Sequence, residues 1–230
     1  MYDQHGPVDR IAEERLQRAV QIMTTEHFTL QSGRGSTIAE TNGRLSVFLV
    51  TTSSTLIAIA FIGQVSQLGQ AFRVFSLLLL PVLLFLGLAT FARVVQSSGE
   101  DALYVAGINR IRHFYLEVVP ELSDYFVLSN HDDLEGIMAS SGIVWTPMQP
   151  FLTAAAMVAV INGIIGGVLV TLLAAWSSTV LLALSVGMGL TVGVLIVAME
   201  VVYGRRVDRH ERWHVARFPA PSTSPTISDT

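Results

Sequence analysis

Long apolar blocks alternate with shorter polar stretches along this chain. Residues 45–72, 74–92 and 136–199 contain no Asp, Glu, Arg or His, and the whole chain contains no Lys. Since a helix needs about 20 apolar residues to cross a bilayer, each block can hold at least one span. The third block is too long for one span, and Trp176 followed by two serines supplies a turn within it. The pattern predicts four transmembrane helices, near residues 46–67, 73–94, 151–175 and 179–202.

The N-terminal residues 9–32 have the spacing of an amphipathic helix. Its stripe recurs every three or four positions and consists of Ala12, Leu16, Val20, Met23, His27 and Leu30. The stripe could pack on other helices of the same chain, lie on the membrane surface, or meet the same helix of a neighbouring subunit; packing within the chain is favoured. Gly33 and Gly35 are expected to loosen the chain before the first span.

A second helix outside the membrane is predicted at residues 99–118. Its apolar stripe consists of Tyr104, Ile108, Ile111, Tyr115 and Val118. Ser97 and Glu100 have the spacing of a capping box at its start, and Pro120 should end or kink it. Residues 137–150 are short and contain two prolines, which fits a loop leading into the third span better than a fifth span. Residues 218–230 are rich in Pro, Ser and Thr and are predicted to be disordered.

Arginine positions predict the topology. Five arginines precede the first span, three lie between the second and third, and five follow the fourth, which leaves Arg73 alone at the opposite face. By the positive-inside rule, both termini and the middle segment are cytoplasmic, in an inner (plasma) membrane. The N-terminus lacks the pattern of a cleaved signal peptide. The absence of cysteine excludes disulfides and thiolate chemistry.

Composition agrees with this topology, because 51% of the residues are hydrophobic and only 14% are charged. The fold class is therefore all-α: an integral membrane protein with four transmembrane helices arranged as two hairpins, plus cytoplasmic amphipathic helices. We expect five parts: a cytoplasmic amphipathic helix in residues 1–44, a first transmembrane hairpin in 45–94, a cytoplasmic helical segment in 95–150, a second transmembrane hairpin in 151–203, and a partly disordered cytoplasmic tail in 204–230.

Polar and small residues within the spans are candidates for helix packing or for lining a pore. Five hydroxyl residues in succession, 51–55, go all the way round the first span, and each of the last two spans contains a GxxxG motif. Packing is favoured over a pore lining, because Ser, Thr and Gly are common at membrane helix interfaces. The candidates are Thr51, Thr52, Ser54, Thr55, Asn162, Gly163, Gly167, Gly189 and Gly193.

Charged residues lie at the ends of the predicted spans, at Arg44, Arg73, Arg93 and Glu200. Proton relays and voltage sensors place charges within the membrane. The pattern therefore disfavours a proton-coupled transporter or a voltage-gated channel.

The sequence GINRIRHFYLE (107–117) carries Arg110, His113 and Glu117 on one helix face, with Arg112 on another side. His and Glu four residues apart can bind a metal, but a simple His–Glu contact is the favoured interpretation. The arginines could also bind phosphate from a lipid headgroup or a nucleotide.

The sequence SNHDDLEG (129–136) gathers one histidine and three carboxylates. Ser129 and Asp132 have the spacing of a capping box, with acidic residues in the first turn of the helix that follows. Capping is the first interpretation, contact with Arg110 or Arg112 the second, and metal binding or catalysis the third. Candidate ligand or contact residues outside the membrane are Arg110, Arg112, His113, Glu117, His131, Asp132 and Asp133.

On TIAETNGR, GINRIRHFYLE and SNHDDLEG, the chain resembles a group of small multi-pass bacterial membrane proteins that have no assigned activity. Its layout of paired spans and short cytoplasmic helices is also similar to that of membrane effectors of bacterial defence systems, which perturb the membrane when signalled. Neither resemblance implies a cofactor or a catalytic residue.

The leading hypothesis is a non-enzymatic, homo-oligomeric membrane protein, either an ion channel or a membrane-perturbing effector controlled through its cytoplasmic helices. Four helices enclose little space, so a conducting path would need several copies. The alternatives are a membrane scaffold that recruits a soluble partner, and a membrane-bound metalloenzyme using His113, Glu117, His131 and Asp132. No cofactor or resident metal is expected, and no motif indicates nucleic-acid binding.

Overall fold

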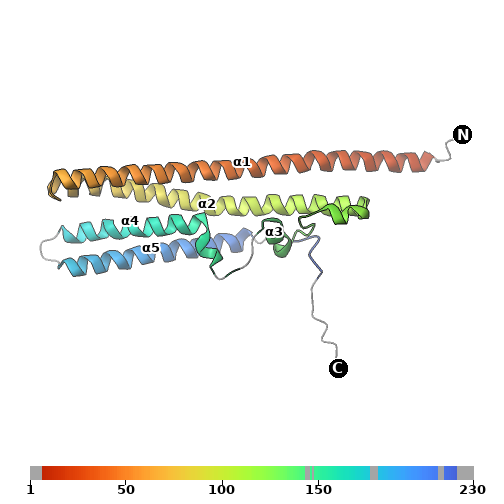
Figure 1. Cartoon of the computed structure of the whole chain (residues 1–230). Coiled ribbons are helices and arrows are strands. Elements are labelled where there is room, and N and C mark those ends of the chain that lie inside the picture. Colours follow the sequence, from red (N-terminus) through yellow and green to blue (C-terminus); the bar gives the residue numbers. More distant parts are fainter. Residues whose placement is uncertain (1–6, 143–145, 147, 177–180, 212–214, 222–230) are drawn as a thin grey trace, which may run out of the picture. The chain divides into compact units, whose positions relative to one another are not determined.

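The computed structural model describes residues 7–142, 146, 148–176, 181–211 and 215–221. Within these residues it is all-helical and contains no strand (Figure 1). The helices are α1 (Pro7–Val65), α2 (Gln70–Val118), α3 (Leu134–Ser140), α4 (Ala154–Ala175) and α5 (Leu182–Glu211), with 3₁₀ helices at Pro120–Tyr125 and Gln149–Leu152. Four of them, α1, α2, α4 and α5, are long and apolar enough to cross a membrane, which confirms the predicted number.

The first helix is longer than predicted. The loosening expected at Gly33 and Gly35 is wrong, because α1 continues through both glycines as one helix of 59 residues. A Cβ atom on Gly33 would lie 2.9 Å from the ring of Tyr104, so this glycine allows close packing against α2. A small residue at a helix contact was mistaken for a break.

The second helix joins the predicted second span and the predicted helix at 99–118 into one element. It runs through Ser97, so the capping box expected there is wrong. It ends at Val118, two residues before Pro120, which confirms the predicted stop. The chain after Pro120 forms 3₁₀ helix as far as Tyr125 and irregular backbone from there to residue 128.

The chain divides into two compact units. Unit 1 comprises residues 1–37, 100–144 and 214–230, and unit 2 comprises residues 38–99 and 145–213. The long helices α1 and α2 each contribute to both units.

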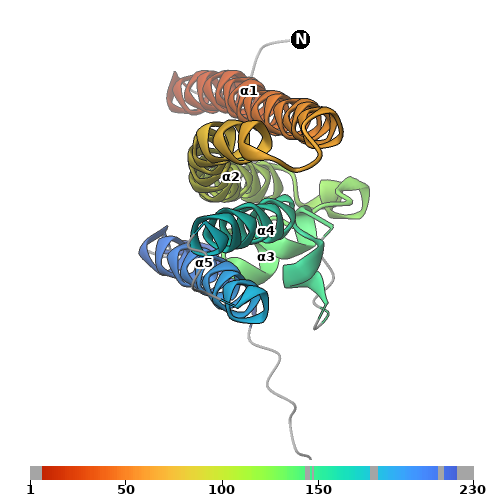
Figure 2. The same ribbon diagram turned by 90° about the vertical axis from the view of Figure 1, so that its left-hand side faces the viewer.

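In unit 2, α2 and α4 lie between α1 and α5 (Figure 2). The core contains Phe48 of α1, Leu83 of α2 and Val158 of α4, each at most 2% exposed. The outer helices present apolar side chains outward, such as Ile57, which is 71% exposed, and Leu190, which is 67% exposed. Such faces suit lipid or a neighbouring subunit.

In unit 1, the N-terminal half of α1 packs along the C-terminal half of α2. Leu30 approaches Gly107, and the Arg34 guanidinium pairs with Asp101 at 2.7 Å. Along the predicted stripe, the residues from Val20 onward are half-buried, whereas Ala12 and Leu16 are exposed. Packing within the chain is confirmed for the second half of the stripe.

Candidate functional site

The acidic loop, residues 129–136, is attached to α2 by Asn109. This side chain is fully buried. Its Nδ2 donates to the backbone carbonyls of His131 at 2.7 Å and Gly136 at 3.2 Å, and its Oδ1 accepts from Arg112 at 2.7 Å. One carboxamide thus provides hydrogen bonds to two backbone carbonyls of the loop.

The loop begins α3 with a different cap from the one expected. Asp133 is the N-cap and accepts from the Gly136 N–H at 2.9 Å. Ser129 does not cap the helix; its Oγ accepts from the His131 N–H at 3.0 Å. The predicted helix start is confirmed, and the choice of Ser129 with Asp132 is wrong. Gly136 is required here, because a Cβ atom would lie 2.1 Å from the His131 carbonyl oxygen.

Asp132 is the most heavily bonded carboxylate of the loop. Its side chain is 0% exposed and pairs with the Arg110 guanidinium at 2.5 Å. It also accepts from the backbone N–H groups of Arg217 at 3.0 Å and Phe218 at 2.8 Å. Burial raises the pKa of this carboxyl, but the donors from Arg217, Arg110 and Phe218 outweigh burial and lower the pKa to about 2. Asp132 is therefore ionised at neutral pH.

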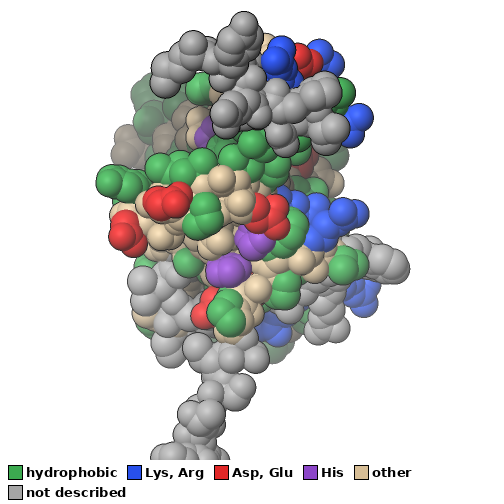
Figure 3. All heavy atoms as spheres, turned by 90° about the vertical axis from the view of Figure 1, so that its right-hand side faces the viewer, with side chains coloured by type: hydrophobic (Ala, Val, Ile, Leu, Met, Phe, Trp, Pro, Cys, Tyr) green, Lys and Arg blue, Asp and Glu red, His purple; other side chains and the backbone are tan. Residues whose placement is uncertain are grey.

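The acidic loop binds the tail segment, residues 215–220. The Phe218 ring stacks on His113 with 4.0 Å between centroids, and the Ala220 N–H donates to Asp133 at 3.0 Å. Arg110 also donates to the Val215 carbonyl at 3.0 Å. The disorder predicted from residue 218 onward is thus wrong for residues 218–220, and residues 222–230 lie outside the described part. Figure 3 shows one face of the protein, on which histidine and acidic side chains lie beside apolar ones.

The remaining candidates outside the predicted spans make structural contacts. His113 and Glu117 lie 3.6 Å apart, as the favoured interpretation expected. Arg112 donates to the Ser129 carbonyl at 3.3 Å, and His131 Nδ1 lies 3.3 Å from the Phe218 carbonyl oxygen. Among the described residues, no three His, Asp or Glu side chains are grouped as metal ligands would be.

The consecutive hydroxyl residues of α1, 51–55, differ in how deeply they are buried. Thr52 is buried in unit 2 and donates to the Phe48 carbonyl at 2.8 Å. Ser54 is exposed, and Thr51 and Thr55 are half-buried. Thr52 therefore serves packing, whereas Ser54 faces away from the core of the chain.

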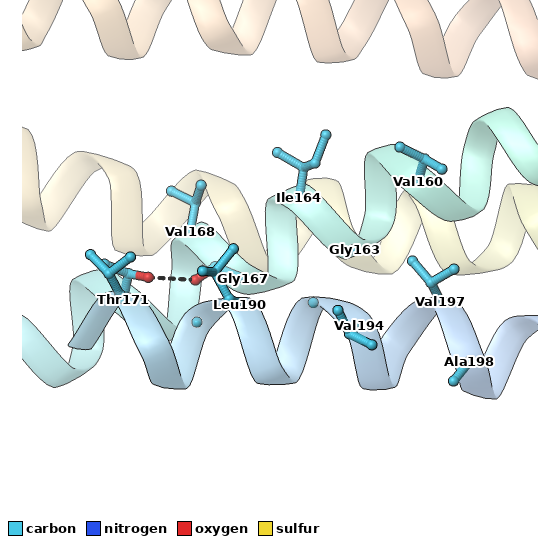
Figure 4. Close-up of a pocket in the computed structure, with 13 residues that line it drawn as sticks. Val160, Gly163, Ile164, Gly167, Val168, Thr171, Leu190, Val194, Val197 and Ala198 are labelled. Carbon is cyan, nitrogen blue, oxygen red and sulfur yellow. Dashed lines mark hydrogen bonds between the residues drawn. The ribbon is translucent and has the colours of Figure 1, made fainter. Parts of the chain in front are cut away.

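The four glycines of the two GxxxG motifs pack α4 directly against α5 within one chain. A Cβ on Gly167 would lie 2.8 Å from the Gly189 carbonyl oxygen, and one on Gly193 would lie 2.7 Å from that of Gly163. At this contact the two motifs therefore pack helices of the same chain. Beside it lies an apolar groove of about 620 Å³, lined by both helices, in which Thr171 donates to the Gly167 carbonyl (Figure 4).

Asn162 bonds Glu200 inside unit 2. Its Nδ2 donates to Glu200 Oε1 at 2.7 Å, and the two residues are 0% and 2% exposed. The sequence placed Glu200 at the polar end of a span, but the structure buries its carboxyl against a residue eight positions into α4. The reason is that helical side chains lean toward their own N-terminus, so Glu200 reaches toward the middle of α5.

Comparisons with protein-family models, curated proteins and solved structures found no match. Function is therefore inferred from the residues themselves.

Sequence reasoning missed Asn109, Phe218 and Gly87, whose Cβ position would lie 1.8 Å from Asn162 Oδ1, and it placed Glu200 at the end of a span. Asn109 carried a usable signal, because it is a polar residue between the apolar positions Ile108 and Ile111 of a packed helix. The roles of the other three depend on contacts between distant segments and have no local pattern.

Proposed function

We propose that this chain is a non-enzymatic integral membrane protein that works as a homo-oligomer, as an ion channel or a membrane-perturbing effector controlled from the cytoplasm. Four helices of sufficient length and apolarity, with apolar outward faces in unit 2, support membrane insertion and association. The observation that carries the proposed control is the binding of the tail segment by the acidic loop.

The tail segment follows α5 closely. This helix ends at Glu211, and the bound segment begins at Val215. Any event that frees the tail therefore removes a restraint from a helix that is expected to cross the membrane. A cation or peptide N–H donor could compete for Asp132, and an anion could compete for Arg110, so the contact suits a signal-dependent switch.

Flux through liposomes containing the purified protein tests this control. Asp132→Asn removes the charge that holds Arg110 and the tail, so its ion flux should exceed that of the wild-type protein. Glu121→Gln is the matched control, because it removes one carboxylate from an exposed position outside the acidic loop. Equal flux through the wild-type, Asp132→Asn and Glu121→Gln proteins would contradict control by the tail.

A second flux experiment addresses the conducting path. Ser54→Leu and Thr55→Leu should change the flux if this face of α1 lines a path between subunits. Thr52→Val is the control, because Thr52 faces the core of its own chain. If only Thr52→Val changed the flux, the face of α1 that carries Ser54 and Thr55 would not line the conducting path.

The scaffold alternative is supported by the first turns of α1. Ile11, Leu16 and Ile22 are exposed, the last at 64%, on a part of the helix outside the predicted spans. A scaffold should lose a co-purifying soluble partner on Ile11→Glu or Leu16→Glu without a change in flux. A channel or effector of the proposed kind should keep its flux whether or not a partner co-purifies.

A further inference from the structure

The carboxyl of Glu200 is buried among apolar side chains with too few hydrogen-bond partners for an ion. It accepts one hydrogen bond, from Asn162, and its Oε2 has no partner among the described residues. The carbonyl oxygen of Asn162 is also buried without a partner there. Both unsatisfied atoms are acceptors, so the site lacks a donor.

A proton on Glu200 removes the buried charge in either orientation of the Asn162 carboxamide, and in the reversed orientation it also supplies the missing donor. If Nδ2 faces Glu200, the carboxylate still has one buried oxygen without a partner. If the amide were reversed, two oxygens would face each other at 2.7 Å, which requires a proton between them. Protonation therefore removes the buried negative charge in the first case and forms the hydrogen bond between the two oxygens in the second.

Charged groups on the neighbouring elements do not replace the proton. Helix α4 contains no ionisable residue. On α1 and α2, Arg44 and Arg93 both bind Glu40, at 3.0 Å and 3.2 Å. On α5, Tyr203 packs against Phe91, and Arg205 and Arg206 follow toward the end of the helix. No ion pair to Glu200 occurs among the described residues, and an isolated buried carboxylate costs several kcal/mol.

The walls of the site are too apolar for a metal ion. A Cβ on Gly87 would lie 1.8 Å from Asn162 Oδ1 and 3.0 Å from the Phe48 ring, and Val158 and Ala159, one turn before Asn162 on α4, are buried. Hard cations take about six or more oxygen ligands, whereas Glu200 and Asn162 together offer three side-chain oxygens between intact helices.

We propose that Glu200 is a proton-binding residue within the membrane part of the protein, with Asn162 as its hydrogen-bond partner. Uptake converts the carboxylate to the neutral acid, and release returns one proton and leaves the charge on Glu200. Asn162 lies eight residues into α4, about 12 Å along the helix at 1.5 Å per residue. The packing of α5 on α4 therefore depends on proton uptake at a buried position.

Labelling by dicyclohexylcarbodiimide tests the proposal, because this apolar reagent reacts with protonated carboxyl groups. Purified full-length protein in detergent is treated at several pH values, and the adduct is located by mass spectrometry after digestion. Glu200 should be labelled at neutral pH, and the rate should fall about tenfold for each pH unit once the carboxyl ionises. Exposed Glu121 in the same sample should stay unlabelled at neutral pH.

Three results would overturn the proposal. The first is no adduct at Glu200, at neutral or mildly acidic pH, in protein that remains folded. The second is a labelling rate at Glu200 that does not change with pH. The third is protection of Glu200 by sodium chloride at constant pH, which would assign the site to a metal cation. The assay measures proton binding and does not require flux, so its failure and the failure of the channel or effector proposal are distinguishable.

Discussion

Asp132 in unit 1 and Glu200 in unit 2 are both buried carboxyl groups, at 0% and 2% exposure. Among the described residues, Asp132 accepts from the Arg110 guanidinium and from the backbone N–H groups of Arg217 and Phe218, whereas Glu200 accepts from a single carboxamide. Burial is therefore a poor guide to the charge of a carboxyl group. The supply of donors decides whether it stays ionised or binds a proton.

The difference arises from the backbone around each group. Asp132 lies in a loop opposite an irregular tail, where the N–H groups of Arg217 and Phe218 are free to donate to a side chain. Glu200 lies between intact helices, whose N–H groups are already used within each helix. A carboxyl group between packed helices has to find side-chain donors or be protonated.

The largest expected effect is that of Asp132→Asn. Removing one partner of a fully buried ion pair costs about 3–5 kcal/mol, and the cost here should lie at the lower end of this range because the Arg110 side chain is 32% exposed. Hydrogen–deuterium exchange should rise at the backbone amides of Arg217, Phe218 and Ala220, while Glu121→Gln leaves them protected. If these amides stayed protected in Asp132→Asn, the ionised carboxylate would not be what holds the tail.

Gly87→Ala should have the next largest effect, because it narrows the Glu200 site. The added methyl group would lie 1.8 Å from Asn162 Oδ1, and overpacking of this kind costs about 1–3 kcal/mol. Thermal unfolding in detergent measures the effect. Gly43→Ala is the control, because nothing lies within 4 Å of its Cβ position. Equal stability of the two variants would show that Gly87 can be replaced without moving Asn162.

Acid should weaken the tail contact only at low pH. The pKa of Asp132 is lowered from 3.8 to about 2, so its stabilisation is fully present above 3.8 and is lost as the pH falls through about 2. The difference between these values corresponds to about 2 kcal/mol. Exchange protection of the tail amides, followed against pH, should stay constant between neutral pH and about pH 4. Loss of protection near neutral pH would show that a titratable group other than Asp132 holds the tail.

The smallest expected effect is that of Glu200→Gln. Gln has the shape of the neutral acid and keeps the contact with Asn162, so the stability should change by less than about 1 kcal/mol. The same carboxyl-to-amide change at Asp132 is expected to cost several times more. Unfolding of both variants in the same detergent compares them, and a large loss at Glu200 would indicate that the site needs a negative charge.

Local patterns predicted much of the fold. Apolar blocks indicated four long helices, Pro120 ended α2 as expected, and the glycine motifs indicated close packing of α4 and α5. The errors came from residues whose role depends on distant partners. The sequence around Gly33 indicates a helix break, whereas the structure shows this glycine packed against Tyr104. The spacing at Ser97 indicates a helix cap, whereas Ser97 lies inside a continuous helix.

The sites were less predictable than the fold, for the same reason. Contact between Asp132 and Arg110 was among the interpretations of SNHDDLEG, because opposite charges on nearby segments attract. The binding of Phe218 had no signal in a tail rich in Pro, Ser and Thr, since the acceptor is 86 positions away. The Glu200 site needs the register of α4 against α5, which the sequence does not specify.

The most direct test of the difference between the two carboxyl groups is the infrared carbonyl stretch of protonated carboxylic acids, measured on purified protein at neutral pH. The band should be present in the wild-type protein and in Asp132→Asn, and it should be lost in Glu200→Gln. A band that disappears in Asp132→Asn, or that remains unchanged in Glu200→Gln, would contradict the assignment of the proton to Glu200.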